Sequence, residues 1–311
     1  MNCAQTILIL GPTASGKSAL ATCLCDALNG RGEIVSADSM QVYSGMDIGT
    51  AKPTAEDRAA IPHHLIDIAS PYEEGFTVDR WLDMAHGAIT KIHATKRIAV
   101  VVGGTNLYVQ ALLAGLFEGP RADEDLRASL RNLSLSDLRT QLARIDPSSA
   151  QRIHPNDQRR MIRAIEVTQL TGIPMSTHQS QWTAAPPSLP AGWQCLGLLP
   201  DPDSNGRAIN SRAKVMMELG FLEEVRGLRA VAPLARQSAE AVGYRELAAH
   251  LDGEQSLERA FEAIKIRTRK LARQQRTWLR RFAHIERSIW STAPCGEKTS
   301  HDFFLRTLGM Q

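Results

Sequence analysis

The sequence predicts an α/β protein in which helices flank a parallel sheet and an all-helical subdomain is inserted into the chain. Three observations support this fold class. Apolar runs of strand length alternate with helix-length stretches over residues 6–116. Two of these runs end in glycine-containing turns that lead into helices, at residues 11–18 and 103–105. Between Gly119 and about Gln181, strand-like runs are absent and charge-rich helical stretches take over.

The first expected strand, residues 6–10, leads into a phosphate-binding motif. Residues 11–18 match G-x-x-x-x-G-K-[ST] at every fixed position, and leucines at helical spacing follow to about residue 28. This strand–loop–helix context predicts a P-loop NTPase-like core. Backbone N–H groups, the Lys17 ammonium and the Ser18 hydroxyl, which can hold Mg²⁺, would bind the phosphates. The expected phosphate-binding residues are Gly11, Pro12, Thr13, Ala14, Ser15, Gly16, Lys17 and Ser18.

A second strand, residues 33–36, leads into Asp38. Ligands of open α/β sheets bind at the carboxyl ends of the strands, so Asp38 should lie near the phosphate loop. A carboxylate there can serve as a general base. The alternative, a turn or helix N-cap aspartate, carries equal weight on position alone.

The next expected elements are a short strand at residues 63–68 and a helix at 81–93. A fully apolar strand at 98–102 ends in Gly103-Gly104-Thr105, and a helix should follow over 106–116. Thr105 would either position a ligand or cap that helix. A motor or switch ATPase would end such a strand in an aspartate for Mg²⁺, so the glycine pair disfavours that class.

We expect a catalytic core made of residues 1–118 and 193–291, a helical insert at 119–182 and a proline-rich linker at 183–192. A strand at 195–200 should return the chain to the sheet, and the remainder reads as helical. The expected helices cover about 204–219, 222–230, 239–251 and 256–282, and residues 292–311 read as a weakly structured tail without an assigned role.

The charge of the chain is concentrated in its last long helix. Residues 265–281 hold eight of the 36 basic residues and no acidic one, which leaves 28 basic against 33 acidic residues elsewhere. Glutamines and Trp278 lie between the arginines, a mixture typical of RNA recognition. The alternative is a solvated helix face that acidic neighbours neutralise.

Five scattered cysteines and the lack of a bilayer-length apolar run lead us to expect a cytoplasmic protein outside the membrane.

An ordered set of motifs resembles the tRNA dimethylallyltransferase family, also described as isopentenyl-diphosphate:tRNA transferases. The set covers residues 6 to about 283. It comprises the phosphate loop, DSMQVY at 38–43, GMDIGTAKP at 45–53, HHLID at 63–67, GGTNLY at 103–108, HPND at 154–157 followed by Arg159-Arg160, VGYR at 242–245 and QRTWLR at 275–280. The zinc finger that eukaryotic members carry at the C-terminus has no counterpart here.

This resemblance implies the reaction. The exocyclic N6 amine of the adenosine 3′-adjacent to the anticodon attacks the allylic carbon of dimethylallyl diphosphate, and diphosphate leaves. The phosphate loop and Mg²⁺ on Ser18 would stabilise the leaving group, and Asp38 would take the amine proton. The base would have to be flipped out of its stack. The implied partners are the tRNA anticodon stem-loop and dimethylallyl diphosphate, and we expect a monomer.

The resemblance also implies roles for individual residues. Thr13, Lys17, Asp38 and Arg212 would be catalytic, with Arg212 adding charge to the diphosphate. The implied tRNA contacts are Asp38, Ser39, Met40, Gln41, Thr105, Arg127, Gln158, Arg159, Arg160, Met161, Ile162, Glu240, Ala241, Val242, Gly243, Tyr244, Arg245, Arg273, Gln274, Gln275, Arg276, Thr277, Trp278, Leu279 and Arg280.

Other functions use the same phosphate loop. Relatives that prenylate free adenine nucleotides share the N-terminal motifs, but the helical insert and the basic helix disfavour them. A small-molecule kinase and a nucleic-acid-binding module without chemistry are the alternatives from other classes.

Overall fold

The computed structural model describes residues 5–117, 119–182, 188–292 and 304. The chain divides into two compact units. The first runs to Leu113 and resumes at Ser188, and the second begins at Ala114. The expected insert began at 119, a few residues later. Residues 183–187 of the expected linker, and the tail except Thr292 and Phe304, lie outside the described residues.

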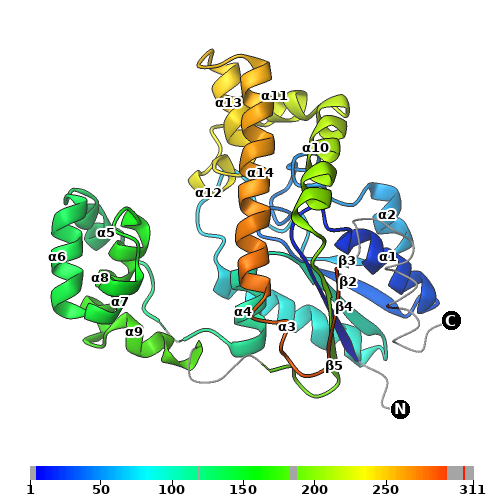
Figure 1. The fold of residues 1–311 in the computed structure, drawn as a ribbon, viewed down its shortest axis with the longest axis horizontal. Helices are drawn as coiled ribbons and strands as arrows, with labels where there is room; N and C mark the ends of the chain where they lie inside the picture. The colour runs from blue at the N-terminus through cyan, green and yellow to red at the C-terminus, as the bar shows by residue number, and fades with distance from the viewer. Residues whose placement is uncertain (1–4, 118, 183–187, 293–303, 305–311) are drawn as a thin grey trace. The chain divides into compact units, whose positions relative to one another are not determined.

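A six-stranded sheet in which all paired strands are parallel forms the centre of the first unit (Figure 1). Its strand order is β3-β2-β4-β1-β5-β6. The strands are β1 (Thr6–Leu10), β2 (Gly32–Ala37), β3 (His63–His64), β4 (Ile98–Gly103), β5 (Trp193–Leu198) and β6 (Ser288–Ser291). Strand β1 is fully buried and lies between β4 and β5. The strand order reverses there, so the end of β1 is a topological switch point, where such sheets bind ligands.

Helices of the first unit connect the strands, although not all of them lie against the sheet (Figure 1). They are α1 (Lys17–Ala27), α2 (Ala55–Ala60), α3 (Val78–Ala94), α4 (Asn106–Ala114), α10 (Pro202–Glu218), α11 (Phe221–Val231), α12 (Arg236–Ala239), α13 (Tyr244–Leu251) and α14 (Leu257–Leu279). Side chains of α1 pack on β1, β4 and β5 in one apolar core, and Phe304 from the C-terminal segment is fully buried in it. The segment to which we assigned no role therefore contributes a core residue.

The second unit consists of short helices around a core of its own. They are α5 (Glu124–Arg131), α6 (Leu135–Ile145), α7 (Pro147–Arg152), α8 (Gln158–Thr171), α9 (Met175–His178) and the 3₁₀ helix η1 (Gln179–Trp182). Aspartate or serine side chains cap α5, α6, α7 and α8 at their N-termini. These caps satisfy backbone donors that a helix leaves unpaired.

Three of the expected elements need correction. The strand expected at 63–68 ends at His64, because Leu65 and Asp67 have positive φ angles of 64° and 56° that a strand cannot continue through. The helix expected from residue 239 begins at Tyr244, after Gly243 with a φ of 95°. The chain beyond 200 is not entirely helical, because β6 adds a sixth strand beside β5. In the described part of the chain, no helix is long and apolar enough to cross a membrane.

Candidate active site at the ends of the central strands

The phosphate loop lies between β1 and α1. Gly16 precedes the helix with a φ of 89°, a left-handed conformation that glycine adopts without strain. Because glycine has no side chain, no side-chain hydrogen bond caps the helix. The first N–H groups of α1 thus lack a side-chain cap and are oriented as anion donors. The Lys17 ammonium donates to the carbonyl of Pro12 at 2.8 Å, within the loop. Ser18 follows on the exposed surface of α1.

Thr13 is held through each of its polar groups. Its N–H donates to Gln275 Oε1 of α14 at 2.8 Å. Its carbonyl accepts from Asn205 Nδ2 of α10 at 3.0 Å, and its hydroxyl accepts from the Arg212 guanidinium of the same helix. The family resemblance implied that Thr13 and Arg212 lie at the diphosphate. In the structure, the two side chains are in direct contact. Their catalytic roles stay proposals.

The ends of β2 and β4 are joined beside this loop. Thr105 Oγ1 accepts from the Ser39 N–H at 3.0 Å and lies 3.3 Å from Ser39 Oγ. Gly104 has no room for a side chain, because a Cβ there would lie 2.8 Å from both the Gly11 carbonyl oxygen and Gln275 Nε2. Consequently, the turn after β4 lies directly against both the phosphate loop and, through Thr105, the residue that follows Asp38.

Asp38 comes directly after β2 and is partly exposed. One carboxylate oxygen accepts from the Met40 N–H at 2.8 Å, which makes it a turn aspartate as well as a candidate base. Among the described residues, Met40 is its one hydrogen-bonding partner, so lone pairs of the carboxylate are left for a substrate proton.

Burial, and to a smaller extent the charges of Tyr43 and Asp38, raises the pKa of the Tyr108 phenol above its ordinary range.

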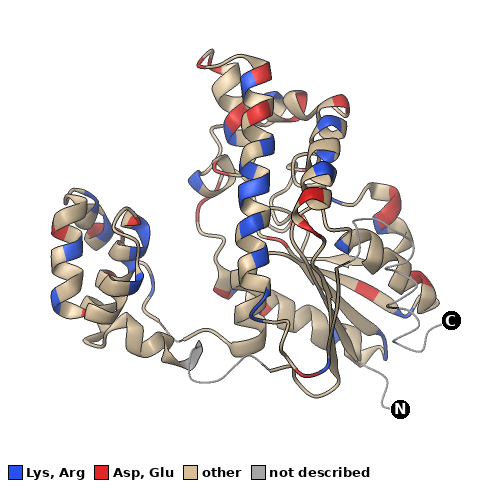
Figure 2. Cartoon of the chain, viewed as in Figure 1, with Lys and Arg blue, Asp and Glu red and all other residues tan. Residues whose placement is uncertain are grey.

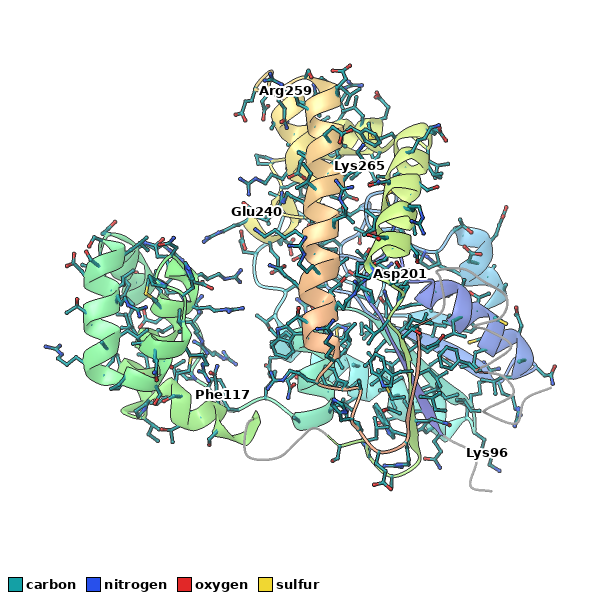
Figure 3. All side chains as sticks on the ribbon, viewed as in Figure 1. Lys96, Phe117, Asp201, Glu240, Arg259 and Lys265 are labelled. Atoms are coloured by element: carbon teal, nitrogen blue, oxygen red, sulfur yellow. The ribbon has the colours of Figure 1, made fainter. Side chains whose placement is uncertain are left out.

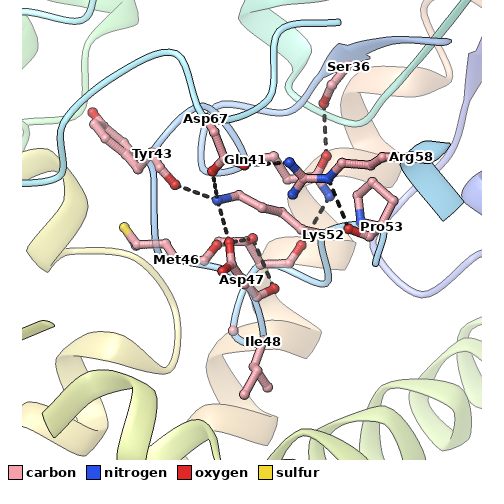
Figure 4. A network of polar contacts seen from close by, with 12 residues as sticks. Ser36, Gln41, Tyr43, Met46, Asp47, Ile48, Lys52, Pro53, Arg58 and Asp67 are labelled. Carbon is pink, nitrogen blue, oxygen red and sulfur yellow. Dashed lines mark hydrogen bonds and ion pairs between the residues drawn. The ribbon is translucent and has the colours of Figure 1, made fainter. Parts of the chain in front are cut away.

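The Gln41 side chain holds the loop that follows β2. Its side-chain oxygen accepts from Ser36 at 2.9 Å, and its amide nitrogen donates to the carbonyls of Thr50 and Ala51, each at 3.2 Å (Figure 4). Both ends of the amide are therefore engaged in holding the loop after β2. The contact of Gln41 with the substrate RNA stays a prediction.

A buried lysine organises the rest of that loop (Figure 4). The Lys52 side chain is 1% exposed and donates to Asp47 at 2.8 Å, to Asp67 at 2.5 Å and to the Tyr43 carbonyl. Burial alone would raise the pKa of Asp67, but hydrogen bonds from Lys52 and Arg58 outweigh it and lower this pKa below its ordinary value. The sequence motif at 45–53 contained this lysine without revealing its role.

Glu224 of α11 fixes the same loop from the other side. Its carboxylate accepts three consecutive backbone N–H groups, from Asp47, Ile48 and Gly49, at 3.0, 2.6 and 3.2 Å. The buried Tyr244 hydroxyl adds a fourth hydrogen bond at 2.6 Å. No sequence pattern marked Glu224. Tyr244, expected at the RNA, instead supports this carboxylate.

Helix α14 has two different faces. Ala272, Gln275 and Leu279 are buried, whereas Lys270, Arg273, Gln274, Thr277 and Arg280 are exposed. The exposed cations are spaced so that they share one face of the helix. Lys and Arg recur along α14 in Figure 2.

Part of the positive charge of α14 is neutralised within the fold. Lys265 pairs with Glu262, and Arg267 pairs with Glu246 and lies 3.9 Å from Glu240. Figure 3 labels Lys265 and Glu240. The expected cationic element therefore narrows to the exposed residues of its C-terminal half. Arg276, partly buried, donates to Asn205 Oδ1 at 3.2 Å.

Several of the expected RNA contacts have buried side chains, and their contact with RNA stays a prediction. In the helical segments, a period of about 3.6 residues turns every third or fourth residue inward. The following side chains are at most 8% exposed and face the protein: Met161, Ile162, Ala241, Tyr244, Gln275 and Leu279. The backbone of Gly243 is buried as well. Gln158, Arg159, Arg160, Glu240 and Arg245 are partly or fully exposed, and Arg245 pairs with Glu240 at 3.0 Å.

Arg127 serves the fold of the second unit. Its guanidinium lies 2.8 Å from the fully buried carboxylate of Glu166, which also binds Arg163 and the Asp123 N–H. Burial would raise the pKa of Glu166, but these hydrogen bonds lower it below the ordinary value. Because its guanidinium pairs with Glu166, Arg127 stabilises the fold of the second unit, and its contact with RNA stays a prediction.

The described residues contain no group of three or more His, Cys, Asp or Glu side chains that could hold a metal ion. Mg²⁺ typically keeps several waters and uses few protein ligands together with substrate phosphates. The donor set here, the Ser18 hydroxyl beside a phosphate loop, fits a cation that arrives with a diphosphate.

Comparisons with known proteins agree with this geometry. The sequence model described as IPP transferase matches residues 41–282. A tRNA dimethylallyltransferase of Geotalea uraniireducens is 44% identical over 288 residues, which cover 90% of this chain and 91% of the relative. One of Methylococcus capsulatus is 45% identical over 284 residues, covering 88% and 89%.

Solved structures are also similar. The full-length tRNA isopentenylpyrophosphate transferase of Bacillus halodurans is 37% identical with a TM-score of 0.69, covering 98% of this chain and 97% of that one. A eukaryotic dimethylallyltransferase captured acting on tRNA is 26% identical with a TM-score of 0.77, covering 97% of this chain and 80% of that one.

Proposed function

Because the chain belongs to the IPP transferase family, we propose that it transfers a dimethylallyl group from dimethylallyl diphosphate to N6 of the adenosine 3′-adjacent to the anticodon of tRNA, releasing diphosphate. The observation that carries this proposal is the contact of Gly104 with both Gly11 and Gln275, together with the Thr105–Ser39 hydrogen bond. It brings the phosphate loop and the Asp38 turn to one edge of the sheet, as a two-substrate transfer requires.

The roles of the donor-site residues follow from their placement. The loop N–H groups, Lys17 and Arg212 would bind the diphosphate and stabilise the charge that develops as it leaves. Arg212 reaches the loop through the Thr13 hydroxyl, which places a permanent charge beside it. Mg²⁺, bound with the diphosphate at Ser18, would neutralise further negative charge. The chain needs no residue to position a hydrolytic water in this reaction.

The acceptor is activated at the opposite end of the site. The N6 amine of an extruded adenine would approach the allylic carbon, and the Asp38 carboxylate would accept its proton as the new C–N bond forms. The turn hydrogen bond to Met40 fixes the orientation of the carboxylate. The loop behind it is held by Gln41, Lys52 and Glu224.

We further propose that the tRNA anticodon stem-loop lies along the exposed face of α14, with Lys270, Arg273 and Arg280 contacting its phosphates. The exposed Gln158, Arg159 and Arg160 at the start of α8 would contact the same RNA from the second unit. The proposed setting is the cytoplasm, and the proposed state is a monomer.

One product assay tests the function. The full chain is incubated with Mg²⁺ and labelled dimethylallyl diphosphate, in parallel with unmodified tRNA, with AMP, and with tRNA in which the adenosine next to the anticodon is replaced by guanosine. We expect label in the unmodified tRNA alone. Label in AMP but not in tRNA would identify a nucleotide prenyltransferase. In a further parallel reaction that contains ATP, phosphate transfer from ATP without use of the prenyl donor would identify a kinase.

A further inference from the structure

A buried glutamine connects the RNA-facing helix to the phosphate loop. Gln275 lies on the inner face of α14, is 8% exposed, and faces away from the exposed cations. Its Oε1 accepts from the Thr13 N–H at 2.8 Å, and its Nε2 donates to the Gly104 carbonyl at 2.9 Å. Because the two partners are a donor and an acceptor, they fix which end of the amide points to which loop.

The next peptide group of the loop, which contains the Thr13 carbonyl, is held as well. Asn205 donates to the Thr13 carbonyl at 3.0 Å and accepts from Arg276, the residue that follows Gln275, at 3.2 Å. Neighbouring residues of α14 therefore bind Thr13 directly and through Asn205. This matters for an anion site, because the direction of each N–H in a phosphate loop depends on the orientation of the peptide groups around it.

We propose that Gln275 is a positioning residue that fixes the diphosphate loop and the end of β4 against α14. This inference rests on the proposed function and deepens it, because it makes one helix serve both substrates. The outer face of α14 binds RNA, and its inner face sets the geometry of the donor site. Gln275 thus acts on the donor rather than on the RNA that its sequence neighbourhood suggested.

The consequence is a selective defect. Loss of both hydrogen bonds leaves the part-buried Thr13 N–H and the buried Gly104 carbonyl without Gln275 as their partner, and the loop must rearrange to satisfy them. The diphosphate then meets a loop that is no longer preorganised. The exposed phosphate-binding cations of α14 are unaffected, so RNA affinity should persist.

The test uses Gln275→Met in the full chain. Methionine keeps the length of the side chain and removes both hydrogen bonds. We expect the KM for dimethylallyl diphosphate to rise about tenfold or more, while the KM for tRNA stays within about twofold of the wild-type value. Gln255→Met is the matched control, because Gln255 donates to the Glu246 carbonyl at 2.9 Å just before α14, away from both substrates. It should leave both KM values unchanged.

Two results would overturn the inference: an unchanged donor KM, or an equal rise of both KM values, which would indicate general damage to the fold. Should Gln275→Met fail to fold, Gln275→Asn replaces it, since the shorter amide can reach only one partner. It should raise the donor KM at least threefold, and a wild-type value would overturn the inference.

Wild-type enzyme in the same assay separates the two hypotheses: its failure to label tRNA would contradict the proposed function, whatever the variants do.

Discussion

Thr13 shows how much of the donor site depends on single contacts. Side chains from α10 and α14 engage its N–H, carbonyl and hydroxyl groups. Each hydrogen bond contributes on the order of 1 kcal/mol in net terms, and the one from a guanidinium contributes more. Together they hold the loop in one conformation. Arg212 has a second role if diphosphate binds here, because its charge lies beside the leaving group.

This role predicts a large effect of removing the guanidinium. Arg212→Ala should lower kcat/KM for dimethylallyl diphosphate by about 100-fold, since it removes charge that stabilises the departing diphosphate. Affinity for tRNA, measured by equilibrium binding, should change by less than about twofold. Arg207→Ala is the control, because Arg207 is an exposed arginine on the same helix. Equal losses in the two variants would contradict the assignment.

The buried and the exposed face of helix α14 have different proposed functions. Its buried residues pack in the core, and one of them, Gln275, accepts a hydrogen bond from the phosphate loop. Its exposed residues include Arg273 and Arg280, which lie seven positions apart and therefore on one face. Arg276 belongs to neither set, since it is partly buried and donates to Asn205. A substitution of Arg276 would therefore disturb the donor site as well as the RNA.

The exposed pair gives a cleaner test of RNA binding. Arg273→Ala and Arg280→Ala should each weaken tRNA binding and reduce the slope of log affinity against log salt concentration by about one, because each removes one phosphate contact. Binding is measured by fluorescence anisotropy over a series of salt concentrations. Lys91→Ala, on the exposed surface of α3, should leave the slope as it is. Unchanged slopes in both arginine variants would exclude this face from the RNA interface.

For the whole molecule, the features governed by local rules could be predicted from the sequence. The apolar runs that became β1, β2, β4 and β5 and the phosphate motif between β1 and α1 follow from periodicity and from a fixed pattern. The strand β6 was missed because it is short and is bounded by serines rather than by an apolar run.

Contacts between distant residues could not be predicted. Gln275 and Thr13 are 262 positions apart, and Glu224 is 177 positions from Asp47. Neither pair leaves a local signal. Met161, Ile162 and Leu279 were assigned to RNA because whole segments were carried over from a resemblance, whereas a helix turns part of each segment into the core.

The central claim is that the edge of the sheet holds a diphosphate while Asp38 deprotonates a nucleobase amine. The most direct test is the single-turnover rate of prenyl transfer by Asp38→Asn, with tRNA and dimethylallyl diphosphate both saturating. Asparagine keeps the size of the side chain and an oxygen for the Met40 hydrogen bond, but it is not a base. We predict that the rate falls by about 100-fold or more while both dissociation constants stay within about threefold. A rate equal to that of the wild type, with tRNA prenylated at the same adenosine, would contradict the account.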